Sequence, residues 1–292
     1  MATVVGTIRA YGHVTRRLGR DLARREPTRH SRQMLAPSNA DRHLGPVAEQ
    51  VSRLARDPTY VRLEGLHCVK HALRFGADVT LLVTADREAA IGLARILAPD
   101  VRARLVADLV ELQAADVDHV MGRQRLDVLG FARRPTSILP PLVAPAVLLQ
   151  DPRNLGNLGA AVRVAAGFGA RAIRTTGSVD PWHPTVVRAA AGLHFAVRVG
   201  RVDDAVGSTA GDGPLLAFDP TGDDLREERI PDDAVLAFGS ERHGLSPGLR
   251  RCADRLVAIP MREGVSSYNL ATSVAVALFH WSAGSGVPVD GS

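Results

Sequence analysis

The chain is 292 residues long, 46% of its residues are hydrophobic, and its formal net charge at pH 7 is +5. An apolar share of this size excludes an intrinsically disordered protein, and the length is enough for two ordinary domains. No apolar run reaches the ~18 residues of a membrane-spanning helix, and the N-terminus lacks the apolar core of a secretory signal. The sequence therefore predicts a cytoplasmic protein that does not enter a membrane.

The positive charge indicates the kind of partner the protein could bind, and the cysteines indicate whether a disulfide is expected. Lys70 is the only lysine, so almost all of the positive charge is arginine, the residue best suited to phosphate contacts and base stacking. This composition favours a polyanionic partner such as RNA, although arginine-rich codon usage explains it equally well. Cys68 and Cys252 lie in different predicted domains, and we expect two buried free thiols rather than a disulfide.

The first half of the chain predicts a basic extension, a small domain and a linker. Residues 1–52 carry nine arginines between Arg9 and Arg42. They are either a solvated extension, partly helical around 14–25, or a basic arm that follows an RNA backbone. Residues 53–137 predict a small α/β domain with helices over 65–73, 88–97 and 108–114 and a strand over 79–83. A proline-rich stretch predicts a linker over 138–145.

From residue 146 to residue 292 the pattern alternates between strands and helices. We expect strands over 147–150, 172–173, 195–199, 215–218, 235–238 and 256–259. Helices are expected over 157–168, where Gly169 ends the helix, over 184–191, from Ser246-Pro247 onward, and over 267–281. Such alternation predicts an α/β domain with a parallel sheet covered by helices on both faces.

Three segments of this second domain place small or polar residues where a strand is expected to end. They are Asn157 to Arg163, Gly239 to Leu245, and Ile259-Pro260-Met261 with Ser267-Tyr268-Asn269. The carboxyl ends of parallel strands meet at one edge of the sheet, which is where open α/β sheets bind ligands. Each segment also has a plain structural explanation, since Asn157 and Ser267 are good helix caps and Gly239 permits a sharp turn.

In this order the three segments resemble the signature of the SpoU/TrmH family of RNA ribose methyltransferases. That signature reads N-x-G-x-x-x-R, then G-S-E-x-x-G-L, then I-P-M followed by S-L-N, and the match covers about residues 146–285. Upstream, Glu64-Gly65-Leu66-His67 resembles the start of the small ribosomal-protein-like RNA-binding domain of many members. The resemblance implies a SPOUT fold with a trefoil knot, S-adenosylmethionine as cofactor, and a homodimer whose active site uses residues of both subunits.

The resemblance also implies roles for individual residues. Arg163 is the expected catalytic residue, and because an arginine is a poor base we expect it to bind the neighbouring phosphate and polarise the ribose hydroxyl. The other residues expected at the catalytic centre, which would orient ribose and cofactor, are Asn157, Glu241, Ser267 and Asn269. The residues expected to contact the cofactor are Gly239, Ile259, Met261 and Tyr268. Arg188 is either an RNA phosphate contact or an ordinary solvated helix arginine.

Two positions complicate the match. Tyr268 stands where the family usually has leucine, which alters the cofactor pocket if the side chain packs on adenine. The stretch Asn154-Leu155-Gly156-Asn157-Leu158-Gly159 contains the opening of the first motif twice, and we choose Asn157 because it leaves Arg163 in the arginine position. The histidines show no zinc-like spacing with cysteine or carboxylate, so no metal is expected.

The predicted activity is methylation of a ribose 2′-hydroxyl in structured RNA, with ribosomal RNA favoured over transfer RNA. The alternatives are a transfer RNA 2′-O-methyltransferase, a base-nitrogen methyltransferase of the same fold, and a non-catalytic RNA-binding relative. A Rossmann dehydrogenase is disfavoured because no G-x-G-x-x-G follows the first strand of the second domain.

Overall fold

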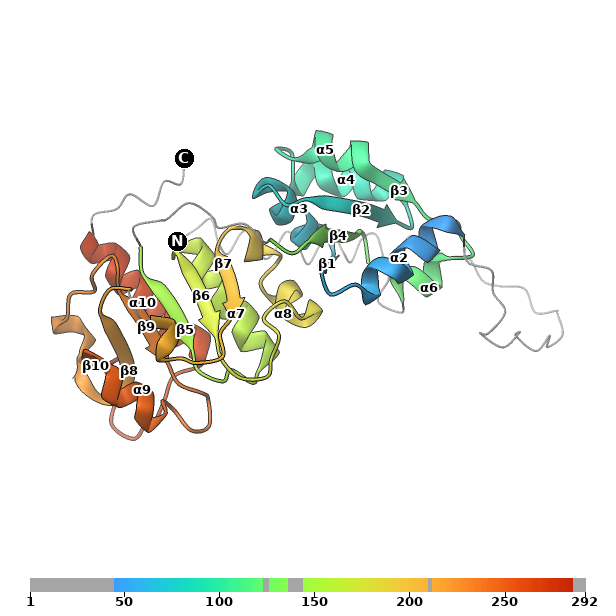
Figure 1. Ribbon diagram of the computed structural model, residues 1–292. Coiled ribbons are helices and arrows are strands. Elements are labelled where there is room, and N and C mark those ends of the chain that lie inside the picture. The colour runs from blue at the N-terminus through green and yellow to red at the C-terminus, as the bar shows by residue number, and fades with distance from the viewer. Residues whose placement is uncertain (1–44, 123–125, 136–143, 210–211, 286–292) are drawn as a thin grey trace. The chain divides into compact units, whose positions relative to one another are not determined.

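The computed structural model describes residues 45–122, 126–135, 144–209 and 212–285. Two sheets, one of four and one of six strands, organise this part of the chain (Figure 1). All of the described residues fall in one compact unit. The expected helix around 14–25, most of the basic extension and most of the linker at 138–145 lie outside the described residues.

The four-stranded sheet belongs to the small domain. Its elements in chain order are α2 (Pro46–Arg56), β1 (Tyr60–Glu64), α3 (Leu66–Arg74), β2 (Val79–Thr84), α4 (Arg87–Leu97), α5 (Arg102–Asp108), β3 (Leu109–Glu111), α6 (Val117–Met121) and β4 (Leu129–Arg133). The strand order is β1-β4-β2-β3, in which only β2 and β3 run parallel. The small mixed α/β domain predicted from the sequence is therefore confirmed; its RNA-binding role stays a prediction.

Several small-domain elements differ from expectation. The expected helix over 108–114 is wrong, because β3 starts at Leu109 and pairs with Leu82 of β2, which satisfies its backbone groups in the sheet. Strands β1 and β4 were not expected, although β1 alternates between partly buried and buried residues. Helix α2 buries Ala48, Val51 and Leu54, so the expected end of the extension at residue 52 falls inside a packed helix.

The six-stranded sheet belongs to the second domain. Its elements are β5 (Ala146–Leu149), α7 (Leu155–Gly167), β6 (Ala172–Thr175), α8 (Pro184–Ala189), η1 (Leu193–Phe195), β7 (Arg198–Arg201), η2 (Gly207–Thr209), β8 (Leu215–Asp224), η3 (Leu225–Glu227), β9 (Val235–Phe238), α9 (Pro247–Cys252), β10 (Arg255–Ala258) and α10 (Leu270–Ser285). All strands run parallel in the order β10-β8-β9-β5-β6-β7.

Both faces of this sheet are buried, as the continuous apolar runs of its strands require. In β5, Val147 and Leu149 join the core cluster that contains α7 and α10, whereas Ala146 and Leu148 join the cluster that contains Leu249 of α9. The predicted α/β class with a covered parallel sheet is confirmed. The trefoil knot stays a prediction.

Local structure explains one boundary of the second domain that differs from expectation and one that agrees with it. The expected strand over 195–199 begins only at Arg198, because Leu193–Phe195 form the 3-10 helix η1 and bury Phe195. Helix α9 begins as expected, since Ser246 accepts a hydrogen bond from the backbone N–H of Leu249 and Pro247 takes the first helical position.

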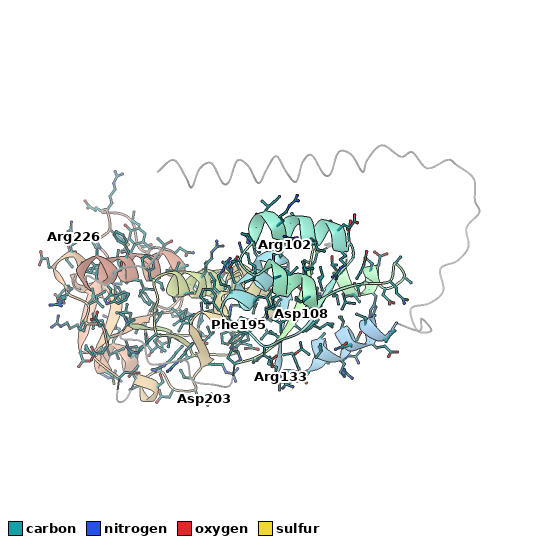
Figure 2. All side chains as sticks on the ribbon, turned by 90° about the horizontal axis from the view of Figure 1, so that it is seen from above. Arg102, Asp108, Arg133, Phe195, Asp203 and Arg226 are labelled. Atoms are coloured by element: carbon teal, nitrogen blue, oxygen red, sulfur yellow. The ribbon has the colours of Figure 1, made fainter. Side chains whose placement is uncertain are left out.

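Helix α8 and η1 pack against the small domain. One buried cluster contains residues of β1 and α3 together with Trp182, Val187 and Phe195. Phe195 is labelled in Figure 2. Gly192 adopts φ +73°, and a Cβ there would come within 2.5 Å of the Cys68 carbonyl oxygen. This close backbone approach leaves room only for glycine.

The two cysteines are free, as expected, but only one is buried. Burial raises the pKa of the Cys68 thiol to about 12, so it stays protonated at neutral pH. Cys252 is exposed, so the expectation of a second buried thiol is wrong. It is the last residue of the short helix α9, whose buried position is Leu249.

Among the described residues, no helix combines the length and the apolar character that a membrane crossing requires.

Candidate active site

The first predicted segment opens helix α7, with Asn154 as its cap. The Asn154 side chain accepts a hydrogen bond from the backbone N–H of Asn157 at 2.9 Å. The expectation that Asn157 caps the helix is therefore wrong, because the helix starts three residues earlier. The Asn157 side chain makes two other bonds: its Nδ2 donates to Glu241 Oε1 at 3.1 Å, and its Oδ1 accepts from Asn269 Nδ2 at 2.9 Å.

The second segment forms a tight turn after strand β9. Ser240 and Gly244 exchange backbone hydrogen bonds of 3.1 and 3.0 Å, which close the turn around Glu241. A Cβ on Gly239 would lie 2.0 Å from the carbonyl carbon of Gly244, so the turn requires glycine there. The turn holds the Glu241 carboxylate opposite the Asn157 amide.

The third segment connects β10 to helix α10 and is capped by Asn269. Asn269 Oδ1 accepts from the backbone N–H groups of Ala271 at 2.9 Å and Thr272 at 3.4 Å. The cap is therefore Asn269 rather than the expected Ser267, which is exposed. Asn269 fixes the helix start with its oxygen and the Asn157 amide with its nitrogen, so one side chain joins two of the three segments.

Tyr268 ties the two ends of the third segment together. Its hydroxyl donates to the carbonyl oxygen of Pro260 at 3.2 Å, while 43% of the residue is exposed. The residues between these two positions are largely exposed. The tyrosine that stands at the family's leucine position therefore braces the loop with its hydroxyl.

These segments border one pocket of about 430 Å³ at the carboxyl ends of the sheet strands. Its lining residues are Asn157, Phe218, Asp219, Pro220, Phe238, Gly239, Ser240, Glu241, Gly244, Ile259, Met261, Ser267, Tyr268, Asn269, Leu270 and Ser273. Eight of the ten predicted site residues are among them; Arg163 and Arg188 are not. The wall made by Phe218, Asp219 and Pro220 was missed, although Asp219-Pro220-Thr221-Gly222 is a typical turn sequence directly after the strand expected over 215–218.

The charge of the pocket is negative. Asp219 and Glu241 are the charged residues in its described lining. Partial burial raises the pKa of Glu241, but hydrogen bonds from Asn157 and from backbone N–H groups outweigh it and hold that pKa below its ordinary value. Glu241 is therefore ionised at neutral pH, and the pocket suits a cationic ligand better than a nucleotide phosphate.

The two predicted arginines lie elsewhere on the second domain. Arg163 is exposed on α7. The pKa of His67 in the small domain is lowered mainly by burial, and the positive charges of Lys70 and Arg163 lower it further. Arg188 forms an ion pair with Glu64 of β1, with Nη1 and Oε2 3.0 Å apart. The roles of both arginines stay predictions.

The described residues contain no cluster of three or more histidine, cysteine or carboxylate side chains that could hold a metal ion.

A six-stranded parallel sheet with a pocket at the carboxyl ends of its strands is the arrangement that the resemblance to SPOUT methyltransferases implied. Residues 144–279 match the model of the SpoU rRNA methylase family. This match agrees with the resemblance seen in the three segments: the second domain is similar to the SpoU/TrmH family of RNA methyltransferases.

Solved structures support the same assignment over more of the chain. An rRNA methyltransferase from Sinorhizobium meliloti, crystallised with bound AdoMet, is 26% identical with a TM-score of 0.65, over 82% of this chain and 94% of that one. AviRb from Streptomyces viridochromogenes, a SpoU methyltransferase, is 21% identical with a TM-score of 0.63, over 81% of this chain and 97% of that one. At that identity AviRb supports the fold alone.

Curated relatives match shorter stretches. A 23S rRNA (uridine(2479)-2′-O)-methyltransferase of Streptomyces viridochromogenes is 31% identical over 60% of this chain and 58% of its own length. A ribosomal RNA small subunit methyltransferase G 2 of Syntrophobacter fumaroxidans is 34% identical over 47% of this chain and 26% of its own length. The chain thus spans less than two thirds of either of these relatives.

Proposed function

We propose that the protein transfers the methyl group of S-adenosylmethionine to a ribose 2′-hydroxyl of RNA, with ribosomal RNA as substrate. The observation that carries this proposal is the meeting of the three family segments in one pocket, through hydrogen bonds between Glu241, Asn157 and Asn269. The printed activity of the Streptomyces relative, 2′-O-methylation of 23S rRNA, supports the choice of ribose and of ribosomal RNA.

The residues of the pocket fit this cofactor. A volume of about 430 Å³ lies within the range of small-molecule sites. Phe218, Phe238 and Ile259 offer an apolar wall for a planar base, with the two phenylalanine rings stacked at a centroid distance of 4.5 Å. S-adenosylmethionine is a sulfonium cation without phosphate, which agrees with Glu241 as an ionised lining group, while the charge of Asp219 is paired with Arg250.

The protein's part in the reaction is mainly positioning. Bound S-adenosylmethionine supplies a methyl group on a positively charged sulfur, which is already activated for transfer. With the cofactor bound, the hydroxyl oxygen would take its methyl carbon, the carbon–sulfur bond would break to leave the neutral thioether, and the hydroxyl proton would pass to water. Asn157, Glu241, Ser267 and Asn269 orient the two reactants, and an arginine polarises the hydroxyl and binds the adjacent phosphate.

That arginine is Arg163, supplied across a homodimer interface. Arg163 does not line the pocket of its own chain, and it lies on α7, which packs beside α10. Helix α10 exposes Val276 and Phe279, the latter with 64% exposure, on the face opposite its core residues. An apolar stripe next to α7 suits a second copy of the chain, and it would bring Arg163 of the partner subunit to the pocket.

The activity is tested by incubating the protein with ribosomal and transfer RNA and labelled S-adenosylmethionine, followed by mass spectrometry of the nucleosides. A 2′-O-methylated nucleoside from ribosomal RNA is expected. Three results would contradict the proposal. A methylated base would indicate a base methyltransferase, and labelling of transfer RNA alone would indicate a transfer RNA enzyme. Calorimetry that detects no binding of S-adenosylmethionine would indicate a non-catalytic relative.

The arginine and the dimer are tested together. Arg163→Ala should lower the rate of methyl transfer by about 10²–10³-fold with cofactor affinity unchanged, the usual effect of losing a group that stabilises the transition state. Phe279→Asp should give a monomer in light scattering and the same loss of activity. Full activity in a monomeric variant would exclude the shared site.

A further inference from the structure

The pairing of strand β8 with β10 is interrupted where β8 borders the pocket. Its neighbour β10 pairs first through Leu256 with Ala217, and then through Val257 with Asp223. Residues 218–222 therefore bulge out of the pairing with β10 between two regular blocks. The bulge returns at Gly222, where a Cβ would lie 2.4 Å from the backbone of Leu256 and Val257, so glycine is needed to bring the chain back to the sheet.

A buried carboxylate fixes the bulge. Asp219 is only 8% exposed, and its Oδ1 accepts from the backbone N–H of Thr221 at 3.0 Å and from the Thr221 hydroxyl at 2.7 Å. Its Oδ2 lies 2.8 Å from Arg250 Nη1. Arg250 Nη2 also donates to Thr221 Oγ1 at 3.1 Å, which closes a ring of three side chains. This arrangement holds one conformation of the bulge, because removing Thr221 or Arg250 leaves the buried Asp219 carboxylate short of a partner.

The bulge and its ring of hydrogen bonds shape one wall of the pocket. Phe218, Asp219 and Pro220 line the pocket, and the Phe218 ring stacks on Phe238 with an interplanar angle of 12°. Arg250 lies on α9, which begins just after the glycine turn that holds Glu241. The Asp219–Arg250 ion pair therefore connects the bulge to the helix that follows the second family segment.

We propose that Asp219 and Arg250 are positioning residues that hold the β8 bulge as the wall for the adenosyl group of the cofactor. The proposal rests on the proposed function, since it assigns this wall to S-adenosylmethionine. The pair acts through Phe218 and Pro220 and does not take part in the methyl transfer. Its effect is on cofactor binding and not on the rate at saturating cofactor.

The test compares variants that weaken the pair without removing the turn. Asp219→Asn keeps an oxygen for the Thr221 N–H but loses the charge, and Arg250→Met removes the partner. We expect each to weaken S-adenosylmethionine binding by about tenfold in calorimetry and to raise its KM with kcat unchanged, the size of effect expected for one charged hydrogen bond. The double variant should bind S-adenosylmethionine about as well as the single variant with the lower affinity, because each substitution removes the same Asp219–Arg250 interaction.

Two further variants keep the outcome decisive. Arg250→Lys retains the positive charge but loses the second contact to Thr221, so it should weaken cofactor binding by about threefold. Because the Arg250 side chain is 39% exposed, this variant provides a test even if Asp219→Asn fails to fold. Arg229→Met changes an exposed arginine outside the pocket and should bind like the wild type. Cofactor affinity within twofold of the wild type in Arg250→Met and Arg250→Lys would overturn the proposal. A wild-type protein that binds no cofactor would instead refute the proposed function.

Discussion

The amide of Asn157 is the centre of the site, and replacing it with a carboxylate of the same shape gives a sharp prediction. Asn157→Asp places a second negative charge about where Nδ2 now lies, 3.1 Å from Glu241 Oε1. Two unit charges at this distance repel by about 1 kcal/mol in water and by about 5 kcal/mol at an effective dielectric constant of 20. Glu241 is exposed, so the lower part of this range applies, to which the lost hydrogen bond adds about 1 kcal/mol. We expect a loss of about 2–3 kcal/mol in the free energy of unfolding.

The repulsion has a pH signature. It raises the pKa of the carboxyl pair, so the folded variant takes up a proton as the pH falls and part of the lost stability returns. Urea denaturation followed by tryptophan fluorescence should show a large deficit at about pH 8 and a smaller one at about pH 5.5.

The control is Asn157→Ala, which loses the hydrogen bonds without adding a charge. In the wild type the pKa of Glu241 lies below its ordinary value, so the stability it contributes is complete above that value and is lost only at more acidic pH. The alanine variant should therefore show the same deficit at both pH values. An aspartate variant whose deficit does not change between them would refute the assignment of the Glu241–Asn157 contact.

Two further predictions concern single groups. Tyr268→Phe removes the hydroxyl that donates to Pro260, and calorimetry should show S-adenosylmethionine binding weakened about two- to tenfold, whereas wild-type affinity would rule out a bracing role. His194 is buried, and burial lowers its pKa to about 4, so the folded protein excludes a proton that the unfolded chain binds below about pH 6.5. Stability should therefore fall by roughly 3 kcal/mol as the pH drops from about 6.5 to about 4, and His194→Gln should flatten this slope in acid titrations followed by fluorescence.

The segments of the site could be predicted from the sequence because each follows a buried strand and contains residues whose chemistry is local. Glycine at 239 and the polar residues at 267–269 are visible in one short window. The cap of α7 could not be decided in the same way, because Asn154 and Asn157 open identical tripeptides. Their roles are distinguished by the hydrogen bonds that Asn157 makes with Glu241 and Asn269, 84 and 112 positions away.

The pocket wall and the small sheet could not be predicted because they depend on partners distant in sequence. The bulge in β8 is stabilised by Arg250, which lies 29 positions beyond Thr221, and nothing near Asp219 indicates that contact. Likewise Leu109 to Glu111 fit a helix by composition, and pairing with β2 makes them a strand. Segments with a strong internal hydrophobic pattern adopt the secondary structure that their own sequence favours. In the other segments, pairing with a neighbouring strand determines the secondary structure.

The contacts among Glu241, Asn157 and Asn269 have a consequence for how the protein matures. Asn157 meets Asn269 across 112 positions of sequence, close to the end of the described chain. Contacts of such separation are among the last to form during folding, and this one cannot form during synthesis until residue 269 has left the ribosome. Affinity for the cofactor should therefore appear only in the finished domain, so a partly folded or truncated chain would be inactive and would not compete for S-adenosylmethionine.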